Sequence, residues 1–284
     1  MKIGLVKSEG KRVPVIIMNG SVLRKADDET NESFFDGDWS AYTTELKGPF
    51  SWSVPVPYIP SLRDFYSFEG HVKNARMKRG LGMEEEWYRI PAYYYSGTSM
   101  LYGTGENVEY PSFSNELDYE VEFAIVIGKE GINIPKEKAL SHVFGLMLAN
   151  DWSTRDLQRR EMRIGLGPSK SKDFGTSLGP HVTTMDELRP CIDEHGKPFI
   201  EIRAYVNGKE YFSGNTNDMY WGITDMIEWA STGTILRQGD VIMSGTLSNG
   251  SILEKENNED LWLKRGDVVR IESQQLGTLE NRVV

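Results

Sequence analysis

The 284-residue sequence contains a single cysteine, Cys191, and only four histidines. One cysteine excludes an intramolecular disulfide and a thiolate metal cluster, so a metal site would have to use oxygen or imidazole ligands. The sequence also lacks a run of about 18 apolar residues, the length that a membrane-spanning helix needs. Its N-terminal segment, Met1 to Lys7, is charged too early for a signal peptide. We therefore expect a soluble, cytoplasmic protein without a membrane partner.

Positive charge is scarce as well, because 32 Lys and Arg stand against 42 Asp and Glu and the formal net charge is -10. This balance opposes nonspecific binding to nucleic acid, so we expect no nucleic-acid partner. Basic residues gather only at Lys73 to Arg79 and at Arg155 to Arg163. We interpret both clusters as charge balance for a small anionic substrate, and solvated helix faces are the alternative.

Familiar nucleotide and nucleophile motifs are also missing. The segment Gly165 to Lys170 has neither the third glycine of a dinucleotide fingerprint nor the Gly-Lys-Ser/Thr ending of a P-loop. No serine or cysteine lies in a nucleophile elbow. The sequence therefore argues against nucleotide binding and against a serine or cysteine nucleophile.

Strand patterns outnumber helical patterns, and hairpin signals are frequent. Asn207-Gly208, between two strand patterns, is typical of a type I′ turn. The regular strand-helix alternation of a doubly wound sheet is missing. We predict a mixed α+β fold, mainly antiparallel β, with a few packed helices. A proline-rich connector, Pro55 to Pro60, predicts a small N-terminal β domain over residues 1–57 and a larger domain over residues 58–284.

Two glutamates stand one residue apart in an apolar strand pattern, Tyr119 to Gly128. Because side chains alternate along a strand, Glu120 and Glu122 point to the same face, with Cα atoms about 7 Å apart. Two buried carboxylates cost on the order of several kcal/mol each unless protons, basic side chains or a metal neutralise them. We interpret the pair as part of a divalent-metal site.

Asp64 and Asp151 are the other two candidate ligands. Asp64 precedes a helix predicted over residues 67–79, and Asp151 ends an apolar strand pattern, where the backbone is rigid. Four oxygen ligands suit a hard cation, Mg²⁺ first, with Mn²⁺ or Ca²⁺ as alternatives. Four carboxylates exceed the charge of one dication by two, and Lys172 and Arg155 could offset that excess.

His71 is the candidate general base. It lies seven residues after Asp64, which is two turns along one face if the segment between them is helical. An imidazole beside a metal site is the expected base near neutral pH. We interpret His142 and His181, which adjoin apolar strand patterns, as structural.

Arg155 and Gln158 are three residues apart on a helix predicted over residues 153–162, so both side chains point from one face. Ser153 and Asp156 would form the capping box of this helix. Both side chains of that face would converge on the ion. The simpler alternative, in which Arg155 pairs with a nearby acid and Gln158 is exposed, stays open.

Six ordered motifs resemble the fumarylacetoacetate hydrolase superfamily. They are Asp64-Phe65-Tyr66-Ser67 with His71, Leu117 to Glu122, Ala149 to Gln158, Lys172 to Thr176, Ser244 to Thr246, and Gly277 to Asn281. The resemblance covers residues 60–284 and implies a fumarylacetoacetase-like β roll, a Mg²⁺ cofactor and a homodimer.

The resemblance also implies roles for individual residues, which fall into three groups. The implied metal ligands are Asp64, Glu120, Glu122 and Asp151, with Lys172 and Thr176 bordering the ion. The implied catalytic residues are His71 as base, Glu254 as the acid that orients it, and Arg155, Gln158 and Lys172 as stabilisers of developing negative charge. The implied substrate contacts are Tyr66, Arg79, Tyr94 and Thr246.

The implied reaction is metal-dependent hydrolysis of a carbon-carbon bond in a 2,4-diketo acid, which releases pyruvate or a related acid. Met162 replaces a tyrosine of the family's namesake enzyme and the loop from Thr246 to Glu254 is shorter, so we expect an acylpyruvate-type or sugar-derived diketo acid. A decarboxylase, isomerase or dehydratase acting on a 2-keto acid through a metal enolate is the closest alternative. A noncatalytic metal-stabilised binding protein is the other.

Overall fold

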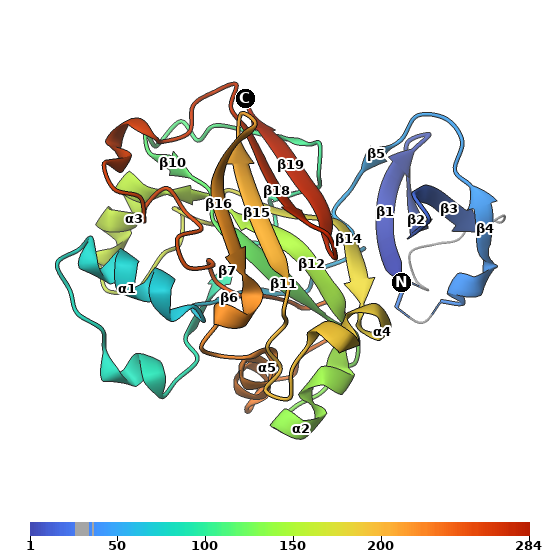
Figure 1. Cartoon of the computed structure of the whole chain (residues 1–284), viewed down its shortest axis with the longest axis horizontal. Coiled ribbons are helices and arrows are strands. Elements are labelled where there is room, and N and C mark those ends of the chain that lie inside the picture. The colour runs from blue at the N-terminus through green and yellow to red at the C-terminus, as the bar shows by residue number, and fades with distance from the viewer. Residues whose placement is uncertain (26–33, 36) are drawn as a thin grey trace.

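The computed structural model describes residues 1–25, 34–35 and 37–284 (Figure 1). Most strands belong to one large sheet. They are β1 (Lys2–Ser8), β2 (Lys11–Met18), β3 (Ser21–Lys25), β4 (Tyr42–Glu45), β5 (Ser51–Trp52), β6 (Leu62–Phe65), β7 (Tyr93–Ser96), β8 (Leu101–Tyr102), β11 (Val121–Ile127), β12 (Val143–Asp151), β14 (Thr176–Thr184) and β17 (Val241–Met243). Their order is β4-β3-β2-β1-β14-β12-β11-β17-β6-β7, with β5 beside β1 and β8 beside β14.

A second sheet has the order β16-β15-β18-β19-β9. Its strands are β9 (Asn107–Val108), β15 (Glu201–Val206), β16 (Lys209–Asn215), β18 (Val268–Ser273) and β19 (Gly277–Val283), and a separate pair joins β10 (Leu117–Asp118) to β13 (Ser153–Thr154). Figure 1 shows β15, β16, β18 and β19 lying across β11 and β12. Side chains of both layers, such as Phe123, Ile202 and Ile271, form one hydrophobic core.

Helices are short and few. The α-helices are α1 (Glu69–Met77), α2 (Lys136–Ala139), α3 (Arg155–Met162), α4 (Met185–Leu188) and α5 (Ile223–Ser231), and the 3₁₀ turns are η2 (Trp39–Ala41), η3 (Glu85–Tyr88), η4 (Leu140–His142), η5 (Arg189–Cys191), η6 (Thr216–Asp218) and η7 (Asn258–Asp260). Antiparallel pairs predominate in both sheets, so the predicted mixed α+β fold is confirmed. Among the described residues, no helix combines the length and the apolar character needed to cross a membrane.

Strand β11 is buried on both faces, which explains its nearly continuous apolar sequence. Val121, Phe123 and Ile125 face the core shared with the second sheet, whereas Ala124 and Val126 belong to a different core on the other side. Full burial of each large apolar side chain stabilises the fold by about 1.5–3 kcal/mol. This burial fixes the register of the strand, because a slip of one residue would exchange its two faces.

Two local predictions, the turn at Asn207-Gly208 and the start of the helix after Asp151, had different outcomes. Asn207 and Gly208 join β15 to β16 with φ angles of 52° and 79°, as the type I′ prediction requires. The capping box of the helix over residues 153–162 is wrong, because that helix begins at Arg155. Ser153 pairs in β13 instead and donates its hydroxyl to the Asp151 carbonyl at 3.0 Å, while the Asp156 carboxylate accepts from Ser114 at 2.5 Å.

The N-terminal strands β1 to β4 extend the large sheet through the pairing of β1 with β14. In Figure 1 they lie at one end of the molecule, away from α1 and α3. A separate small core that includes Ile3, Leu5 and Trp39 packs between them. The division of the chain at residue 57 stays a prediction.

Candidate active site

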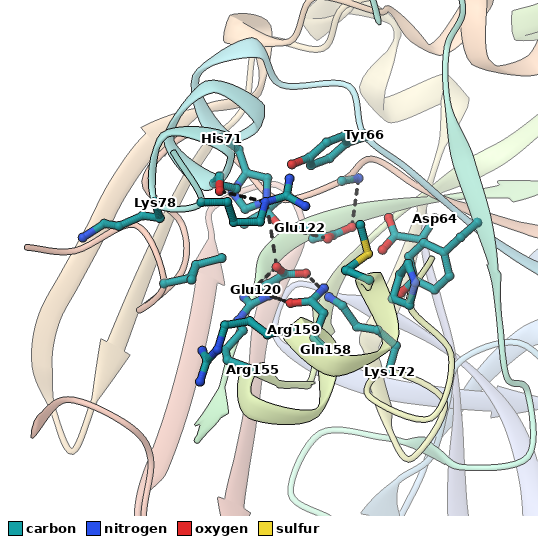
Figure 2. Close-up of a pocket in the computed structure, with 18 of the residues that line it drawn as sticks. Asp64, Tyr66, His71, Lys78, Glu120, Glu122, Arg155, Gln158, Arg159 and Lys172 are labelled. Atoms are coloured by element: carbon teal, nitrogen blue, oxygen red, sulfur yellow. Dashed lines mark hydrogen bonds and ion pairs between the residues drawn. The ribbon is translucent and has the colours of Figure 1, made fainter. Parts of the chain in front are cut away.

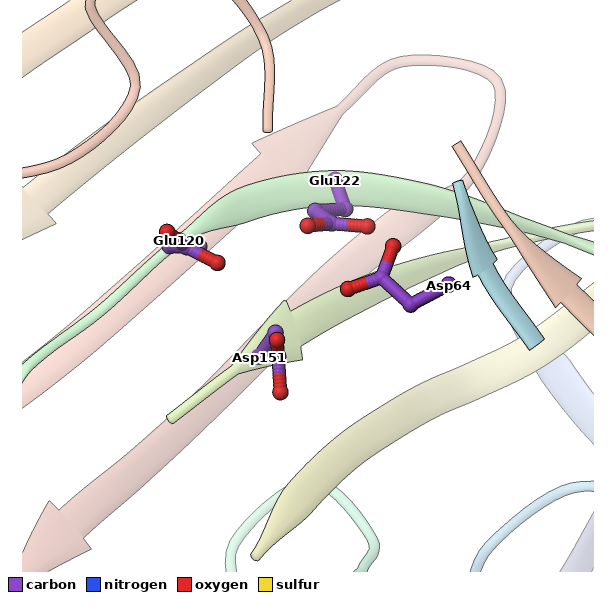
Figure 3. Close-up of side chains that lie close together, drawn as sticks. All are labelled: Asp64, Glu120, Glu122 and Asp151. Atoms are coloured by element: carbon purple, nitrogen blue, oxygen red, sulfur yellow. The ribbon is translucent and has the colours of Figure 1, made fainter. Parts of the chain in front are cut away.

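Four buried carboxylates meet where the strands of the large sheet lie closest to α1 and α3. Asp64, Glu120, Glu122 and Asp151 each offer one oxygen, and these oxygens all lie within 4.8 Å of one another (Figure 3). Asp64 belongs to β6, Glu122 to β11 and Asp151 to the end of β12, while Glu120 directly precedes β11. The structure thus brings the four predicted ligands together, and their binding of a metal stays a prediction.

Electrostatics in this acidic cluster are dominated by burial. Burial raises the pKa of Asp64 and of Glu122 well above the usual range, and the neighbouring carboxylates raise both pKa values further. Burial alone would also raise the pKa of Glu120, but Lys172 and Arg155 outweigh it and lower that pKa. The Lys172 ammonium donates to Glu120 and to Asp151, the latter at 2.6 Å.

The acidic cluster fits a hard divalent cation. Asp64 Oδ1, Asp151 Oδ1 and Thr176 Oγ1 are buried and have no hydrogen-bond partner among the residues that the structure describes. Buried polar atoms rarely lack a partner in folded proteins, so these three oxygens indicate a missing one. Carboxylate and hydroxyl oxygens are the ligands that Mg²⁺ and Mn²⁺ prefer, and no sulfur or imidazole is among the four predicted ligands.

His71 and Glu254 form a buried pair beside the acidic cluster. His71 Nδ1 lies 2.8 Å from Glu254 Oε2. Its Nε2 lies 3.9 Å from Glu120 Oε1 (Figure 2). Backbone N–H of Asn249 and the hydroxyl of Ser251 also donate to Glu254, at 2.8 and 2.9 Å. Burial would raise the pKa of Glu254, but His71 lowers it. This arrangement orients Nδ1 toward Glu254 and Nε2 toward the acids.

The spacing argument that related His71 to Asp64 is wrong in its geometry. Asp64 lies in β6, and α1 does not begin until Glu69, so the two residues do not share a helix face. The turn between β6 and α1 brings both side chains to one pocket instead. Family resemblance alone indicated Glu254, which lies in a loop after β17.

Arg155 occupies the first turn of α3 and is only 2% exposed. Its guanidinium donates to Glu120 Oε1 at 2.7 Å, to Gln158 Oε1 at 2.9 Å and to Asp118 Oδ2 at 2.8 Å. Burial would lower the pKa of Arg155, but the larger combined effect of Glu120 and Asp118 raises that pKa above its usual value. Asp118 was missed by the sequence analysis, although strand alternation back from Glu122 and Glu120 would have placed it beside them.

A pocket of about 420 Å³ opens above the acidic cluster and His71. The four predicted substrate contacts all line it: Tyr66, Arg79, Tyr94 and Thr246. The Tyr94 hydroxyl donates to Asp151 at 2.6 Å, and burial raises the pKa of Tyr66 to about 12. Other lining residues, which no motif marks, are Ala75, Leu253, Asn258 and Trp262, whereas Lys78 and Arg159 belong to the two basic clusters interpreted as charge balance for an anionic substrate.

Curated sequence relatives match about two thirds of this chain. Human mitochondrial oxaloacetate tautomerase FAHD2A is 37% identical over 186 residues, which are 66% of this chain and 56% of that protein. The oxaloacetate tautomerase YisK of Bacillus subtilis (strain 168) is 34% identical over 204 residues, 72% of this chain and 64% of that protein. The matched region thus spans less than two thirds of the length of either relative.

Solved structures share the fold. The fumarylacetoacetate hydrolase from psychrophilic Exiguobacterium antarcticum has a TM-score of 0.81 at 23% identity, covering 100% of this chain and 99% of that one. The 5-carboxymethyl-2-hydroxymuconate delta-isomerase from Mycobacterium smegmatis has a TM-score of 0.75 at 23% identity, with the same coverage. These likenesses confirm the predicted β-roll fold. Residues 61–284 match the family model described as Fumarylacetoacetate (FAA) hydrolase C-terminal, and the chain belongs to the fumarylacetoacetate hydrolase family.

Proposed function

We propose that this protein is a divalent-metal-dependent hydrolase that cleaves a carbon-carbon bond in a 2,4-diketo acid of the acylpyruvate or sugar-derived type. The observation that carries the proposal is the buried His71–Glu254 pair beside the acidic cluster. A carboxylate that holds one imidazole nitrogen leaves the other free to take a proton, which is the arrangement of a general base. Mg²⁺ is the proposed ion, with Mn²⁺ or Ca²⁺ as alternatives.

A bound divalent ion would supply Lewis-acid polarisation of the adjacent keto oxygens of the substrate. The protein's own residues would handle the protons. His71 Nε2 would take a proton from water, and the resulting hydroxide would add to the distal carbonyl carbon. The bond between that carbon and the neighbouring methylene then breaks. The departing enolate takes the proton back from the imidazolium, so a carboxylic acid and pyruvate, or a related 2-keto acid, are released.

Charge that develops on the attacked oxygen needs donors nearby. Lys172 stays protonated, because Asp151 and Glu120 outweigh the effect of burial and raise its pKa. Gln158 accepts from Arg155 through Oε1, which turns its amide N–H₂ away from the guanidinium and makes it available as a donor. Arg155 itself is held by three partners, so we propose that it acts mainly by orienting Glu120 and Gln158.

The pocket is consistent with a small anionic substrate. Its volume of about 420 Å³ lies in the lower range of ligand sites. Arg79, Lys78 and Arg159 line it beyond the acidic cluster and would attract a carboxylate. Tyr66, Tyr94 and Thr246 are retained as proposed substrate contacts. A homodimer, a cytoplasmic location and the absence of nucleic-acid and membrane partners remain proposals from the sequence.

Keto-enol tautomerisation of a 2-keto acid is the second candidate. The human and Bacillus subtilis relatives are named as oxaloacetate tautomerases, which favours it. The same imidazole could move a proton between a carbon and an oxygen of the substrate without any attack by water. Hydrolysis and tautomerisation therefore differ in whether an oxygen from water enters the product.

The test is a panel of acylpyruvates, diketo sugar acids and oxaloacetate, assayed with Mg²⁺ and with chelator in water that carries a heavy oxygen isotope. Hydrolysis predicts loss of diketone absorbance and a label in the carboxylic acid product. Tautomerisation predicts interconversion of keto and enol forms without cleavage of a carbon-carbon bond, and therefore without a labelled carboxylic acid product. Turnover of oxaloacetate alone, with no cleavage of any diketo acid, would overturn the hydrolase proposal in favour of the second candidate.

A further inference from the structure

Asp118 is a buried carboxylate outside the pocket. It contacts both Arg155 and the loop that leads to Glu254. It is 0% exposed, lies in β10 and is absent from the pocket lining. Its Oδ2 accepts from Arg155 Nε at 2.8 Å, and an Arg155 terminal nitrogen lies 2.8 Å from the same oxygen. On the other side, Oδ1 accepts from the Ile252 backbone N–H at 2.8 Å and Oδ2 from that of Leu253 at 3.0 Å.

These contacts complete a ring of polar interactions. Leu253 directly precedes Glu254, which holds His71. Arg155 donates to Glu120, whose Oε1 lies 3.9 Å from His71 Nε2. Asp118 therefore links the loop that carries the partner of the base to the arginine that holds a predicted metal ligand.

From this geometry we infer that Asp118 is a positioning residue, which sets the distance between the imidazole and the acidic cluster. Every partner of its carboxylate is an N–H donor, so both oxygens are needed as acceptors. An asparagine would place an N–H₂ group either in the position of Oδ1, against the Ile252 N–H, or in the position of Oδ2, against Arg155 and the Leu253 N–H, and in both cases it meets another donor. The inference rests on the proposed function for its effect on turnover, and on the polar ring and the predicted metal ligands for its effect on ion binding.

The experiment compares Asp118→Asn with a matched control, Asp240→Asn. Asp240 is also buried, accepts from the Arg237 backbone N–H at 2.8 Å and lies 3.6 Å from Arg63, but it is absent from the pocket lining and the polar ring. Thermal unfolding monitors the fold of both variants. Calorimetric titration with Mn²⁺ and steady-state kinetics then report on the site.

We expect Asp118→Asn to weaken Mn²⁺ binding by about 10-fold and to lower kcat by about 10- to 100-fold, the range found when residues that orient metal ligands are changed. KM should change by less than about 3-fold, because Asp118 does not touch the substrate. Asp240→Asn should lose thermal stability and keep both Mn²⁺ affinity and kcat within about 3-fold. Unchanged Mn²⁺ affinity in a folded Asp118→Asn would overturn the inference.

A double variant separates positioning from a general structural role. If Asp118 acts through Glu254, Asp118→Asn should lower kcat in the wild-type background and have little further effect in Glu254→Gln. Equal fold losses in both backgrounds would refute the coupling. If the wild-type protein cleaves no diketo acid, the proposed function fails, but the Mn²⁺ titration still decides the inference about Asp118.

Discussion

Metal binding should stabilise the folded protein, and the size of the effect can be worked from the acidic cluster. Its four oxygens lie within 4.8 Å of one another, and two ionised carboxylates at that distance would repel by about 3 kcal/mol at an effective dielectric constant near 20, a cost that bound protons or a bound cation remove. The unfolded chain has no such cluster, so ion binding adds to the free energy of unfolding. At 100 times Kd this gain is about 2.7 kcal/mol, which corresponds to a rise in Tm of about 5–10 °C for a chain of this size.

The pH dependence of this rise in Tm has a definite sign. Burial raises the pKa of Asp64 and Glu122, so the metal-free protein holds protons there that the ion must displace. Ion binding therefore releases protons, and the difference in Tm between the metal-bound and metal-free protein should grow from pH 5 to pH 8. Differential scanning calorimetry with Mg²⁺ or chelator measures that difference, and titration in buffers of different ionisation enthalpy counts the protons.

Asp64→Asn sharpens the experiment. The amide needs no proton to be neutral, so the metal-free variant should melt above the metal-free wild type, by more at pH 8 than at pH 6. The same variant should lose most of the rise in Tm with Mg²⁺, whereas Asp240→Asn, which changes a buried acid outside the acidic cluster, should keep it. The reasoning is refuted if wild-type Tm is the same with Mg²⁺ and with chelator, or if Asp64→Asn keeps the full rise.

Three further predictions test the site and its surroundings. His71→Ala should lower cleavage of the true substrate by about 100- to 10,000-fold and keep the Tm rise with Mg²⁺, and full activity would refute its role as base. Burial lowers the pKa of His181 to about 4, so the unfolded chain gains a proton between pH 6.5 and 4 that the folded protein does not. Urea unfolding should therefore show that His181→Gln loses less stability than wild type over this interval, where the wild-type slope reaches about 1.4 kcal/mol per pH unit for this group. Gly245→Ala should lower the free energy of unfolding by about 1–3 kcal/mol, because Gly245 has φ +80° and a Cβ there would clash with the Phe65 carbonyl oxygen. It should also weaken Mn²⁺ binding, because the Gly245 N–H donates to Glu122. An unchanged urea unfolding curve would contradict this prediction.

Strand periodicity carried most of what the sequence could predict about the site. The two-residue period of a strand is a local property, so Glu120 and Glu122 could be placed on one face without any knowledge of the fold. Asp151 was also placed correctly at the end of its strand, because the apolar run from Val143 to Ala149 leads up to it. The order of the strands could not be found this way, because it depends on the whole fold: β6, which carries Asp64, is separated from β11 in the sheet by β17.

Features that depend on contacts between residues far apart in the sequence could not be predicted from local patterns. Ser153 has the sequence of a helix cap, but pairing of β13 with β10 takes it into a strand and delays the helix to Arg155. Glu254 lies in a loop whose position depends on hydrogen bonds to Asp118, 136 residues earlier in the sequence numbering. No local pattern encodes such a contact, so family resemblance was the only route to that residue.

The wall of the pocket, rather than the acidic cluster, should decide the substrate. Hydrolysis and tautomerisation can use the same carboxylates and the same imidazole, but Ala75, Leu253 and Trp262 also line the pocket and offer apolar surface. An acyl chain could cover that surface, whereas a smaller 2-keto acid would leave it in contact with water. Burial of each additional CH₂ is worth about 0.8 kcal/mol, so kcat/KM should rise about 3- to 4-fold per carbon along a series of straight-chain acylpyruvates until the pocket is full. Replacement of Leu253 by Ser should reduce that slope, and a slope that stays flat in the wild-type enzyme would contradict the role of the apolar wall.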